Sequence, residues 1–435
     1  MKSVKIGICG LGTVGSGTFN VLAQNADLVA ARALAPIEIV HVGARRDHPD
    51  CDTADVKVSR DIFDVVKDPD VEVIVELIGG TTIARELVEG AIRAGKHVVT
   101  ANKALIAEFG NGIFALAEEN RVTVRYEAAV AGGIPIIKAL REGLAGNQIE
   151  WLAGIINGTG NFILSEMREK GRDFAEVLAE AQVLGYAEAD PTFDVEGIDA
   201  AHKLVILAAI AFGTPLQFSE VYTEGITKLT TQDVDYAGEL GYRIKHLGVA
   251  KQSEKGIELR VHPTLIPDTR LLANVNGVKN AVLVQGSAVG PTLYYGAGAG
   301  AEPTASAVVA DIIDLARDIS VGQHSRVPAL GVAPQAIAEL PVVPMLDVET
   351  PWYLRMEALD KPGVMTQVTR ILSEQGISIE ALIQKAPAGG EARVPVIVLT
   401  NIAAQGALES AVAGIEALDS ITGKIACIRV EPLEG

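Results

Sequence analysis

The sequence is poor in cysteine and in long apolar runs, and each shortage excludes a class of protein. Its 435 residues include three cysteines, Cys9, Cys51 and Cys427, which are too few and too scattered for a disulfide framework or a cysteine zinc site. No uninterrupted apolar run reaches the roughly 18 residues of a membrane-spanning helix, and no signal peptide precedes the first strand-like residues. We therefore expect a soluble protein of the cytoplasm, with no membrane partner.

Positive charge and aromatic residues are also scarce. The chain has 37 Lys and Arg against 55 Asp and Glu, a formal net charge of −18, which argues against nucleic acid or an anionic membrane as a partner. Hydrophobic residues make up 49% of the chain and aromatic residues only 4%, so most of the hydrophobic residues are small or aliphatic. This composition is typical of α/β layers with buried parallel strands, and the length predicts two to three domains.

A dinucleotide-binding motif lies near the N-terminus. An apolar strand expected over residues 4–9 leads into a G-x-G-x-x-G turn over residues 10–15, and a helix follows. In this motif Gly10 makes the tight turn, Gly12 lets a pyrophosphate approach the backbone, and Gly15 lets helix and strand pack closely. The N-terminus of the helix supplies amide donors. An ordinary glycine-rich turn between a strand and a helix is the alternative.

The end of the next strand bears on the type of nucleotide. A strand expected over residues 37–43 is followed by Arg45 and Arg46, where an NAD-selective fold usually carries Asp or Glu for the ribose hydroxyls. Two arginines suit a 2′-phosphate instead, through charge-assisted contacts. We therefore favour NADP(H) as the cofactor, with NAD(H) as the alternative. If the two arginines have no binding role, they are solvated residues of a loop.

Further strands and helices alternate up to about residue 135. Strands are expected over residues 71–78, 97–100 and 122–126, and Lys103 and Glu127 follow the carboxyl ends of the last two. Ligands in open α/β sheets bind at such carboxyl ends. Lys103 could therefore meet a substrate carboxylate beside a nicotinamide, although residues in such places are more often structural.

The most distinctive stretch is an acidic run from Gly185 to Lys203. It holds five carboxylates and opens a strongly apolar helix that continues over residues 204–210. Asp199 and Lys203 are four residues apart, so they share one face of the helix. Because a lysine in such a helix is costly without a partner or a function, Lys203 becomes a candidate catalytic acid. The alternative is a structural ion pair between Asp199 and Lys203.

Two more glycine-rich turns precede helices. Residues 157–161, Asn-Gly-Thr-Gly-Asn, follow a strand expected over 149–156 and start a helix over 162–170, where they could bind a small polar ligand or cap the helix. Residues 295–300 precede a helix expected over 305–318. This second turn could close over a cofactor, or it could pack at a domain junction.

The C-terminal part reads as a small module behind a proline-containing linker at residues 340–344. Its expected strands cover residues 352–358, 394–400 and 421–430, and one more strand is expected to start at residues 376–379. Its expected helices cover residues 365–375 and 407–418. The order βαββαβ is ferredoxin-like.

Together these residues resemble homoserine dehydrogenase. The shared features are the glycine-rich start, Ala-Asn-Lys at 101–103, Asn-Gly-Thr at 157–159 and the run 185–203, which matches the family's spacing of glutamate, aspartates and lysine through nineteen positions. The C-terminal module resembles an ACT domain. The resemblance covers essentially the whole chain, and we expect the monofunctional form because no aspartate-kinase domain precedes residue 1.

The resemblance implies an α/β chain of three domains. A Rossmann-like NAD(P)-binding domain is expected over residues 1–134, completed by a returning segment near 300–340. An α+β domain for substrate binding, catalysis and dimerisation should cover residues 135–300. A ferredoxin-like ACT regulatory domain should cover residues 350–435. A homodimer or homotetramer is implied as well.

The resemblance also assigns roles to single residues. Lys203 corresponds to the general acid and base. The substrate-binding positions are Glu188, Asp199, Asp194 and Lys103. The cofactor-binding positions are Gly10, Gly12, Thr13, Val14, Gly15, Arg45, Lys103, Gly185 and Gly300. A monovalent cation, sodium, would be held mostly through backbone carbonyls at Glu127, Val130, Gly132 and Ile134.

The implied reaction is the reversible NAD(P)H-dependent reduction of L-aspartate 4-semialdehyde to L-homoserine, in threonine, methionine and isoleucine biosynthesis. Threonine is the implied effector at the ACT domain. Two other functions stay open on the sequence. One is another NAD(P)-dependent semialdehyde or alcohol dehydrogenase, and the other is a non-enzymatic sensor of NADPH and an amino acid.

Overall fold

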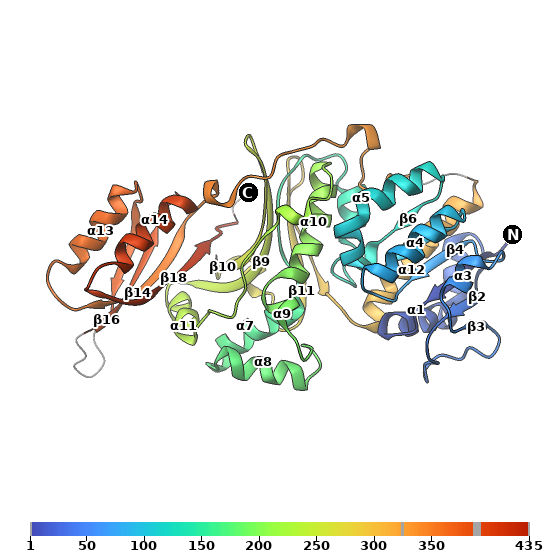
Figure 1. Ribbon diagram of the computed structural model, residues 1–435, viewed down its shortest axis with the longest axis horizontal. Coiled ribbons are helices and arrows are strands. Elements are labelled where there is room, and N and C mark those ends of the chain that lie inside the picture. The colour runs from blue at the N-terminus through green and yellow to red at the C-terminus, as the bar shows by residue number, and fades with distance from the viewer. Residues whose placement is uncertain (1, 323–325, 386–392, 434–435) are drawn as a thin grey trace. The chain divides into compact units, whose positions relative to one another are not determined.

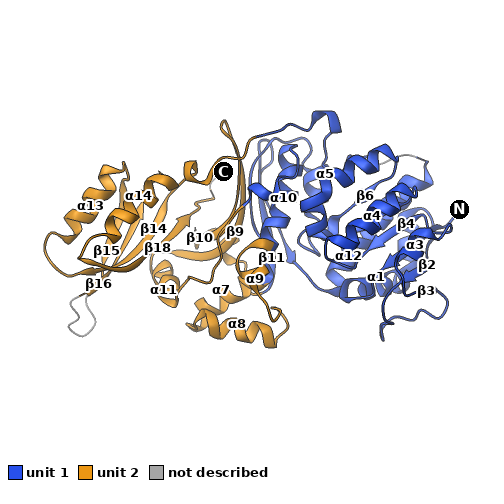
Figure 2. Ribbon diagram, viewed as in Figure 1, with its two compact units in different colours: residues 1–158, 199–221, 278–340 blue, residues 159–198, 222–277, 341–435 orange. Residues whose placement is uncertain are grey.

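The computed structural model describes residues 2–322, 326–385 and 393–433 (Figure 1), and its contacts divide the chain into two compact units (Figure 2). The first unit consists of Met1–Gly158, Asp199–Val221 and Val278–Leu340. The second unit consists of Thr159–Ile198, Tyr222–Gly277 and Pro341–Gly435. The three domain boundaries expected from the sequence stay predictions.

The first unit begins with a six-stranded parallel sheet in the order β3-β2-β1-β4-β5-β6. This is the strand order of a Rossmann fold, and it confirms the expected α/β class. The strands are β1 (Val4–Cys9), β2 (Ile37–Gly43), β3 (Lys57–Ser59), β4 (Val73–Glu76), β5 (His97–Thr100) and β6 (Val124–Arg125). The helices between them are α1 (Thr13–Gln24), α2 (Ala26–Ala33), α3 (Phe63–Lys67), α4 (Thr82–Arg93) and α5 (Lys103–Glu119).

A helix from much later in the sequence, α12 (Ala301–Ser320), packs into the core of this sheet. Its Val308 and Ile312 belong to the same buried apolar cluster as Ile6 of β1. The approach of α12 to α1 is so close that a Cβ added at Gly17 would stand 2.7 Å from a backbone oxygen of α12. The returning chain therefore covers the nucleotide-binding sheet with apolar surface.

The rest of the first unit adds a three-stranded antiparallel group and a buried helix. Strand β11 (Lys279–Gly286) pairs with both β7 (Ile149–Ile155) and β12 (Gly290–Ala297). The helix is α10 (Ile198–Phe212), whose residues 199–210 are all buried. The short elements are η1 (Glu127–Ala129), α6 (Ile136–Lys138), η2 (Ala139–Gly143), η3 (Phe218–Glu220) and η5 (Pro334–Ala336).

The second unit combines helices of the middle segment with a long hairpin. The hairpin joins β9 (Tyr242–Ser253) and β10 (Gly256–Pro267) and was not foreseen from the sequence. Its other elements are α7 (Gly158–Lys170), α8 (Phe174–Val183), α9 (Thr192–Val195), β8 (Tyr222–Thr223), α11 (Thr231–Glu239) and η4 (Leu272–Asn274).

The C-terminal module has the expected ferredoxin-like order. It runs through β14 (Trp352–Leu359), α13 (Val364–Glu374), β15 (Ile379–Gln384), β16 (Arg393–Thr400), α14 (Gln405–Glu416) and β18 (Ile421–Val430), with the short elements η6 (Met345–Asp347), β13 (Glu349–Thr350) and β17 (Ala403–Ala404). Its sheet order is β18-β14-β16-β15. Strand β10 pairs in parallel with β18, so the module extends the sheet of the hairpin instead of standing apart.

Element boundaries differ from expectation mainly at glycine-rich turns. Helix α7 begins at Gly158 and α12 at Ala301, each four residues before the expected start, and β15 (Ile379–Gln384) begins at the last residue of the stretch expected to start it. Glycine and proline are usually taken as signs that a helix is interrupted. The first turn of a helix tolerates both, because its backbone N–H groups have no hydrogen-bond partner within the helix. No helix of the described residues is long and apolar enough to cross a membrane.

Candidate active site

The glycine turn between β1 and α1 combines two glycines that the fold requires with one that it does not. Gly10 has φ +102°, and a Cβ there would stand 2.7 Å from a backbone oxygen of Leu77. A Cβ at Gly15 would stand 2.0 Å from the Gly10 oxygen. A Cβ at Gly12 would meet nothing within 4 Å, and no side chain caps the first turn of α1. The turn therefore leaves room and amide donors for a pyrophosphate.

This contrast predicts the behaviour of Gly12→Ala. Alanine is compatible with the φ of −73° at this position, so the folded protein should keep its unfolding midpoint. The added methyl group would occupy the space of the pyrophosphate, and the dissociation constant for NADPH should rise at least about tenfold. Calorimetric titration with NADPH measures the effect. The control is Gly90→Ala in α4, which also meets no neighbour; equal NADPH affinity in both variants would contradict the assignment.

Two arginines extend from the carboxyl end of β2. Arg45 and Arg46 are both exposed, and neither forms an ion pair with a described residue. Their neighbour Asp47 instead pairs with Arg60 at 2.9 Å. The expected arginines are therefore available to solvent or to a ligand at the edge of the nucleotide-binding sheet.

Sequence reasoning missed a buried carboxylate in this region. Glu76 ends β4 fully buried, and it accepts hydrogen bonds from the Thr100 hydroxyl at 2.5 Å and from the amide of Ile78 at 2.9 Å. Burial raises the pKa of this carboxyl group. The Thr100 hydroxyl in turn accepts from the amide of Asn102, and Asn102 caps α5. The sequence signal that could have indicated this site is Glu76 itself, a single acidic residue at the end of a run of β-branched residues.

This network fixes the residue next to Asn102. Lys103 is the first residue of α5, with its side chain 34% exposed. The side-chain amide of Asn102 donates to the backbone oxygen of Gly80 at 2.6 Å, and its side-chain oxygen accepts from the backbone amide of Leu105 at 3.1 Å. The backbone next to Lys103 is therefore fixed by two hydrogen bonds of the Asn102 side chain.

A lysine–carboxylate centre lies at the start of α10. Asp199 and Lys203, expected on one helix face, form an ion pair of 2.7 Å between Oδ2 and Nζ. The Lys203 ammonium also donates to the backbone oxygen of Ile156 at 2.7 Å, directly after β7. The second carboxylate oxygen, Oδ1, lies 3.3 Å from the Nζ of Lys103. One carboxylate therefore joins two lysines from different elements.

Electrostatics keep Asp199 ionised in spite of its burial. Asp199 is 5% exposed, and burial alone would raise the pKa of its carboxylate. The charges of Lys203 and Lys103 outweigh burial, with further help from hydrogen bonds donated by Lys203 and by Asn157 at 2.8 Å, and the pKa of Asp199 falls to about 2. Two ammonium groups and one carboxylate leave net positive charge at this centre, which suits an anionic group or a developing oxyanion.

Of the Asn-Gly-Thr-Gly-Asn turn, residues 158–161 form the first helical turn of α7 and Asn157 precedes it, and the polar side chains have protein partners. Asn157 contacts Asp199, while the Thr159 hydroxyl donates to the backbone oxygen of Tyr186 at 2.6 Å. The amide of Asn161 donates to backbone oxygens of Val275 and Gly277. Of the turn, Asn157 is the residue that the structure brings to the lysine centre.

Three expected site residues belong to the second unit and are described with it. Gly185, with φ +74°, Glu188 and Asp194 lie in the segment between α8 and α10. The Glu188 side chain is exposed, and its backbone oxygen accepts from the side-chain amide of Gln182 at 3.0 Å. Asp194 lies in α9 and is partly buried. The binding roles of these three residues stay predictions.

The expected cation loop, residues 127–134, lies in the first unit. Both carboxylate oxygens of Glu127 accept hydrogen bonds from backbone amides, of Ile137 at 2.9 Å and of Lys138 at 2.8 Å. The carboxylate is therefore not arranged as a metal ligand. Burial, together with the charge of Asp311, raises the pKa of Glu127 to about 8. The described residues contain no cluster of three His, Cys, Asp or Glu side chains suited to a metal. A cation here would depend on backbone oxygens.

Backbone geometry in this loop is compatible with such a role. The carbonyl oxygens of Val130 and Gly132 accept none of the hydrogen bonds found among the described residues, while Ile134 donates its amide to Ala131 at 2.9 Å. Gly132 has φ +43°, and a Cβ there would stand 2.7 Å from the oxygen of Gly298. Gly300, with φ +124°, directly precedes α12.

The first unit thus supplies a glycine turn typical of nucleotide-binding folds and a buried lysine paired with a carboxylate. The fold and the site define an NAD(P)-dependent oxidoreductase. Family models described as "Homoserine dehydrogenase, NAD binding domain", "Homoserine dehydrogenase" and "ACT domain" match residues 10–127, 135–313 and 352–416. The chain belongs to the homoserine dehydrogenase family.

Individual relatives agree with this assignment. A homoserine dehydrogenase from Pseudomonas aeruginosa is 62% identical over 433 residues, which cover 100% of both chains. The crystal structure of a homoserine dehydrogenase from Thiobacillus denitrificans has a TM-score of 0.94 and 57% identity, and covers 100% of this chain and 99% of that one. A hyperthermophilic archaeal homoserine dehydrogenase in complex with NADPH has a TM-score of 0.61 and 25% identity, with 72% of this chain and 97% of that chain covered.

This enzyme therefore interconverts L-aspartate 4-semialdehyde and L-homoserine with a nicotinamide cofactor, and it carries a C-terminal ACT domain. The activity belongs to the biosynthesis of amino acids. Of the functions left open by the sequence, a dehydrogenase for a different substrate and a non-enzymatic sensor are set aside by the full-length identity.

Proposed function

We propose that Lys203 is the proton donor and acceptor of this reaction. The observation that supports the proposal is its buried ammonium, held by Asp199 and by the backbone oxygen of Ile156 at 2.7 Å each. A bound nicotinamide supplies the hydride in one direction and accepts it in the other. As the aldehyde oxygen gains negative charge, protonated Lys203 gives it a proton, and in the reverse direction the neutral amine removes the hydroxyl proton.

Asp199 supports both lysines in this scheme. Its Oδ2 accepts from Lys203 and Asn157, and its Oδ1 faces Lys103, so the carboxylate sets the position of two ammonium groups at once. Lys103, which is partly exposed, is assigned to the carboxylate of the substrate. Glu188 is assigned to the substrate ammonium through a charge-assisted contact, with Asp194 as a neighbouring acid.

Steady-state oxidation of NADPH with L-aspartate 4-semialdehyde tests these assignments. Variants without the Lys203 amine should lose turnover while they still bind NADPH. Wild-type turnover without that amine would contradict the proposed role.

NADPH is proposed as the preferred cofactor. Arg45 and Arg46 are exposed and without ion pairs to described residues, and no acid ends β2. The archaeal relative binds NADPH in its solved structure. Both observations favour a 2′-phosphate contact at Arg45.

Replacing Arg45 with alanine should therefore raise KM for NADPH about tenfold and leave KM for NADH unchanged, because a hydrogen bond between charged groups is worth about 1.5–3 kcal/mol. Initial rates with both cofactors measure the difference. Arg93→Ala, in α4 and paired with Glu89, controls for the loss of one positive charge. An equal rise in KM for both cofactors would show that Arg45 does not read the phosphate.

A sodium ion is further proposed at the loop from Glu127 to Ile134. The proposal is supported by the backbone oxygens of Val130 and Gly132, which accept no hydrogen bond from the described residues. The Glu127 carboxylate, in contrast, already accepts two backbone hydrogen bonds. Neutral carbonyl oxygens are ordinary ligands of hard cations. A homo-oligomer and a cytoplasmic location, both expected from the sequence, stay predictions.

Inhibition by L-threonine is proposed at the loop Asp360–Val364 of the ACT domain, between two subunits. Gly363, with φ +92°, precedes α13 without a side-chain cap, and Asp360 accepts from the side-chain amide of Gln384 at 2.9 Å. A carboxylate of the effector would meet the N-terminus of α13. Asp360→Ala should weaken inhibition by L-threonine at least about tenfold with kcat unchanged, as measured by dose–response curves; unaltered inhibition would place the effector elsewhere.

A further inference from the structure

Helices α5 and α10 share a second polar contact in addition to the ion pair between Lys103 and Asp199. The Nε2 atom of His202, the residue before Lys203 in α10, lies 3.2 Å from Oε1 of Glu108 in α5. Glu108 follows Lys103, the first residue of α5, by five positions. At the helical rise of 1.5 Å per residue, the contact lies about 7.5 Å along the helix axis from Lys103. The two contacts therefore join the N-terminal part of α5 to the start of α10.

The imidazole ring of His202 is fixed in place. The residue is 2% exposed, and its ring stacks on that of Phe218 in η3, with centroids 4.2 Å apart and 13° between the planes. Burial lowers the pKa of His202, so the ring is neutral near pH 7. A neutral imidazole donates one N–H, and a carboxylate only accepts, so Nε2 carries the hydrogen and donates it to Glu108. His202 thus offers α5 a donor whose position is set by α10.

The later part of α5 is anchored differently. The side-chain amide of Asn111 donates to the backbone oxygen of Leu216 and its side-chain oxygen accepts from the amide of Leu216, both at 3.0 Å. A Cβ added at Gly110 would stand 2.5 Å from Cδ1 of Leu216, which shows how closely the two segments pack. These contacts hold α5 to the segment that follows α10. The contact of Glu108 with α10 itself lies nearer to Lys103.

The ion pair of Lys103 is the one most sensitive to the position of α5. Its Nζ lies 3.3 Å from Oδ1 of Asp199, against 2.7 Å for Lys203, and its side chain is 34% exposed against 11% for Lys203. The attraction between charges weakens with distance and with access of water. Lys203 belongs to the same helix as Asp199, whereas Lys103 is brought to the carboxylate by another helix. A small shift of α5 would therefore separate Lys103 from Asp199 first.

We propose that His202 is a positioning residue for this reaction. Through Glu108 it holds α5 against α10, and it thereby keeps the ammonium of Lys103 at Asp199, where that ammonium can meet the substrate carboxylate. The effect on the substrate rests on the proposed role of Lys103, but the effect on the position of Lys103 does not. His202 serves here as a fixed hydrogen-bond donor and exchanges no proton with the substrate.

The reactivity of Lys103 toward an acylating reagent, followed by peptide mass spectrometry on the full-length enzyme, tests the placement directly. A neighbouring carboxylate favours the unreactive ammonium form of a lysine, so a Lys103 that has left Asp199 should be acylated at least about threefold faster. We expect this gain in His202→Leu and in Glu108→Met. His202→Gln should react as the wild type does, because its side-chain amide can donate in place of Nε2. Unchanged reactivity of Lys103 in both His202→Leu and Glu108→Met would overturn the proposal.

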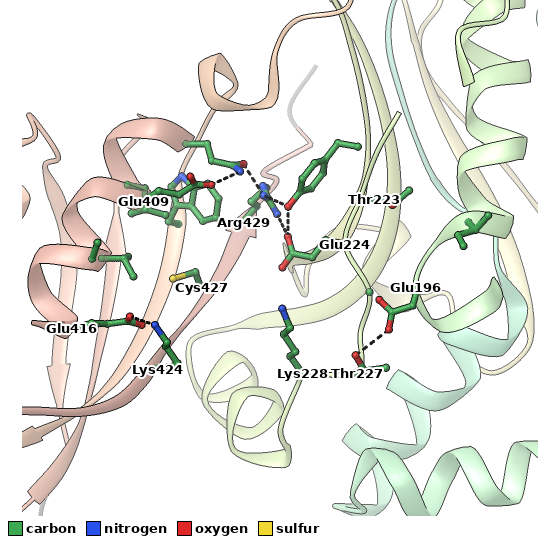
Figure 3. Close-up of a pocket in the computed structure, with 18 residues that line it drawn as sticks. Glu196, Thr223, Glu224, Thr227, Lys228, Glu409, Glu416, Lys424, Cys427 and Arg429 are labelled. Carbon is green, nitrogen blue, oxygen red and sulfur yellow. Dashed lines mark hydrogen bonds and ion pairs between the residues drawn. The ribbon is translucent and has the colours of Figure 1, made fainter. Parts of the chain in front are cut away.

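Two controls accompany these variants. Lys424 pairs with Glu416 at 2.6 Å in the second unit (Figure 3) and is the internal reference, because its ion pair is the same in every variant. Glu118→Met removes an exposed carboxylate from the same helix α5 and should leave the reactivity of Lys103 unchanged. Equal acylation of Lys103 in Glu118→Met and Glu108→Met would show that any acid lost from α5 has this effect, and would also overturn the proposal.

Initial rates then measure the consequence for the reaction. His202→Leu and Glu108→Met should raise KM for L-aspartate 4-semialdehyde at least about fivefold with kcat nearly unchanged, the pattern expected when a binding contact is lost, and His202→Gln should restore KM. Lys103→Met is the reference for complete loss of the contact. Faster acylation of Lys103 in His202→Leu, with KM unchanged there and in Lys103→Met, would support the placement by His202 and contradict the substrate role of Lys103. A raised KM in Lys103→Met, with neither acylation nor KM changed in His202→Leu and Glu108→Met, would contradict the placement alone.

Discussion

Replacing Lys203 with alanine should lower kcat for the reduction of L-aspartate 4-semialdehyde by about 10²–10⁴-fold, the usual contribution of a positioned acid–base group. The ammonium proposed to protonate the developing oxyanion is absent in this variant, whereas the glycine turn assigned to the cofactor is unchanged. The dissociation constant for NADPH should therefore stay within about twofold of the wild type. Stopped-flow kinetics and a parallel cofactor titration measure the two quantities.

Two further variants separate proton transfer from charge. Lys203→Arg keeps a cation beside Asp199 but holds its proton too tightly to exchange it near neutral pH, so turnover should stay low. Lys170→Ala removes the lysine of another i,i+4 ion pair, with Glu166 in α7, and should leave kcat unchanged. If Lys203→Arg worked at the wild-type rate, a positive charge alone would be sufficient and the acid–base assignment would fail.

The second large effect is expected from Asp199→Asn. The change leaves two ammonium groups, one of them 11% exposed, without their shared counterion. Removing one partner of a buried ion pair typically costs about 3–5 kcal/mol, and we expect the free energy of unfolding of the first unit to fall by that order. Turnover should fall as well, because Lys203 and Lys103 lose the group that positions them. Urea unfolding and steady-state rates at neutral pH measure both effects.

The stability difference should depend on pH in a defined direction. The pKa of Asp199 is about 2 in the folded protein, below its unfolded value of about 3.9. A carboxylate with a lowered pKa contributes stability that is present above the unfolded pKa and is lost as the pH falls through the folded pKa. The difference between wild type and Asp199→Asn should therefore be constant above about pH 5 and shrink below about pH 4. A difference that grew on acidification would contradict the ionised state of Asp199.

The matched control is a carboxylate that also bridges two cations, but at the surface. Glu89 in α4 contacts Arg85 at 2.7 Å and Arg93 at 2.9 Å, and these arginines are 49% and 59% exposed. Because exposed ion pairs contribute about 0–1 kcal/mol, Glu89→Gln should change the unfolding free energy by less than about 1 kcal/mol. A loss equal to that of Asp199→Asn would mean that burial is not the reason for the larger effect.

Several features of the site followed from the sequence because their cause is local. The glycine spacing at residues 10–15 determines a turn that larger residues cannot form, as the 2.0 Å approach at Gly15 shows. The spacing of Asp199 and Lys203 determines a contact on one helix face, and the observed ion pair is 2.7 Å long. The order βαββαβ was readable from alternating apolar periods, because one layer of helices on one sheet needs no distant partner.

Other features required contacts between distant segments. The carboxylate of Asp199 meets Asn157, 42 residues away in the sequence, and Lys103 from another helix. Together with the neighbouring charge of Lys203, these partners lower its pKa to about 2. The buried Glu76 gains its role from Thr100 on the neighbouring strand. The hairpin of β9 and β10 had no strong turn signal, and its pairing with β18 brings Arg429 into one sheet with residues more than a hundred positions earlier.

The sequence by itself therefore determined the class of fold, the nucleotide turn, the lysine–aspartate pair and the family, because backbone conformation and helical spacing depend on neighbouring residues. Only the tertiary structure decided which groups share Asp199, how closely α12 approaches α1 at Gly17, and that β10 pairs with β18. The physical reason is that burial, and the electrostatic interactions strengthened by it, arise between segments whose distance in the sequence carries no information about their distance in space.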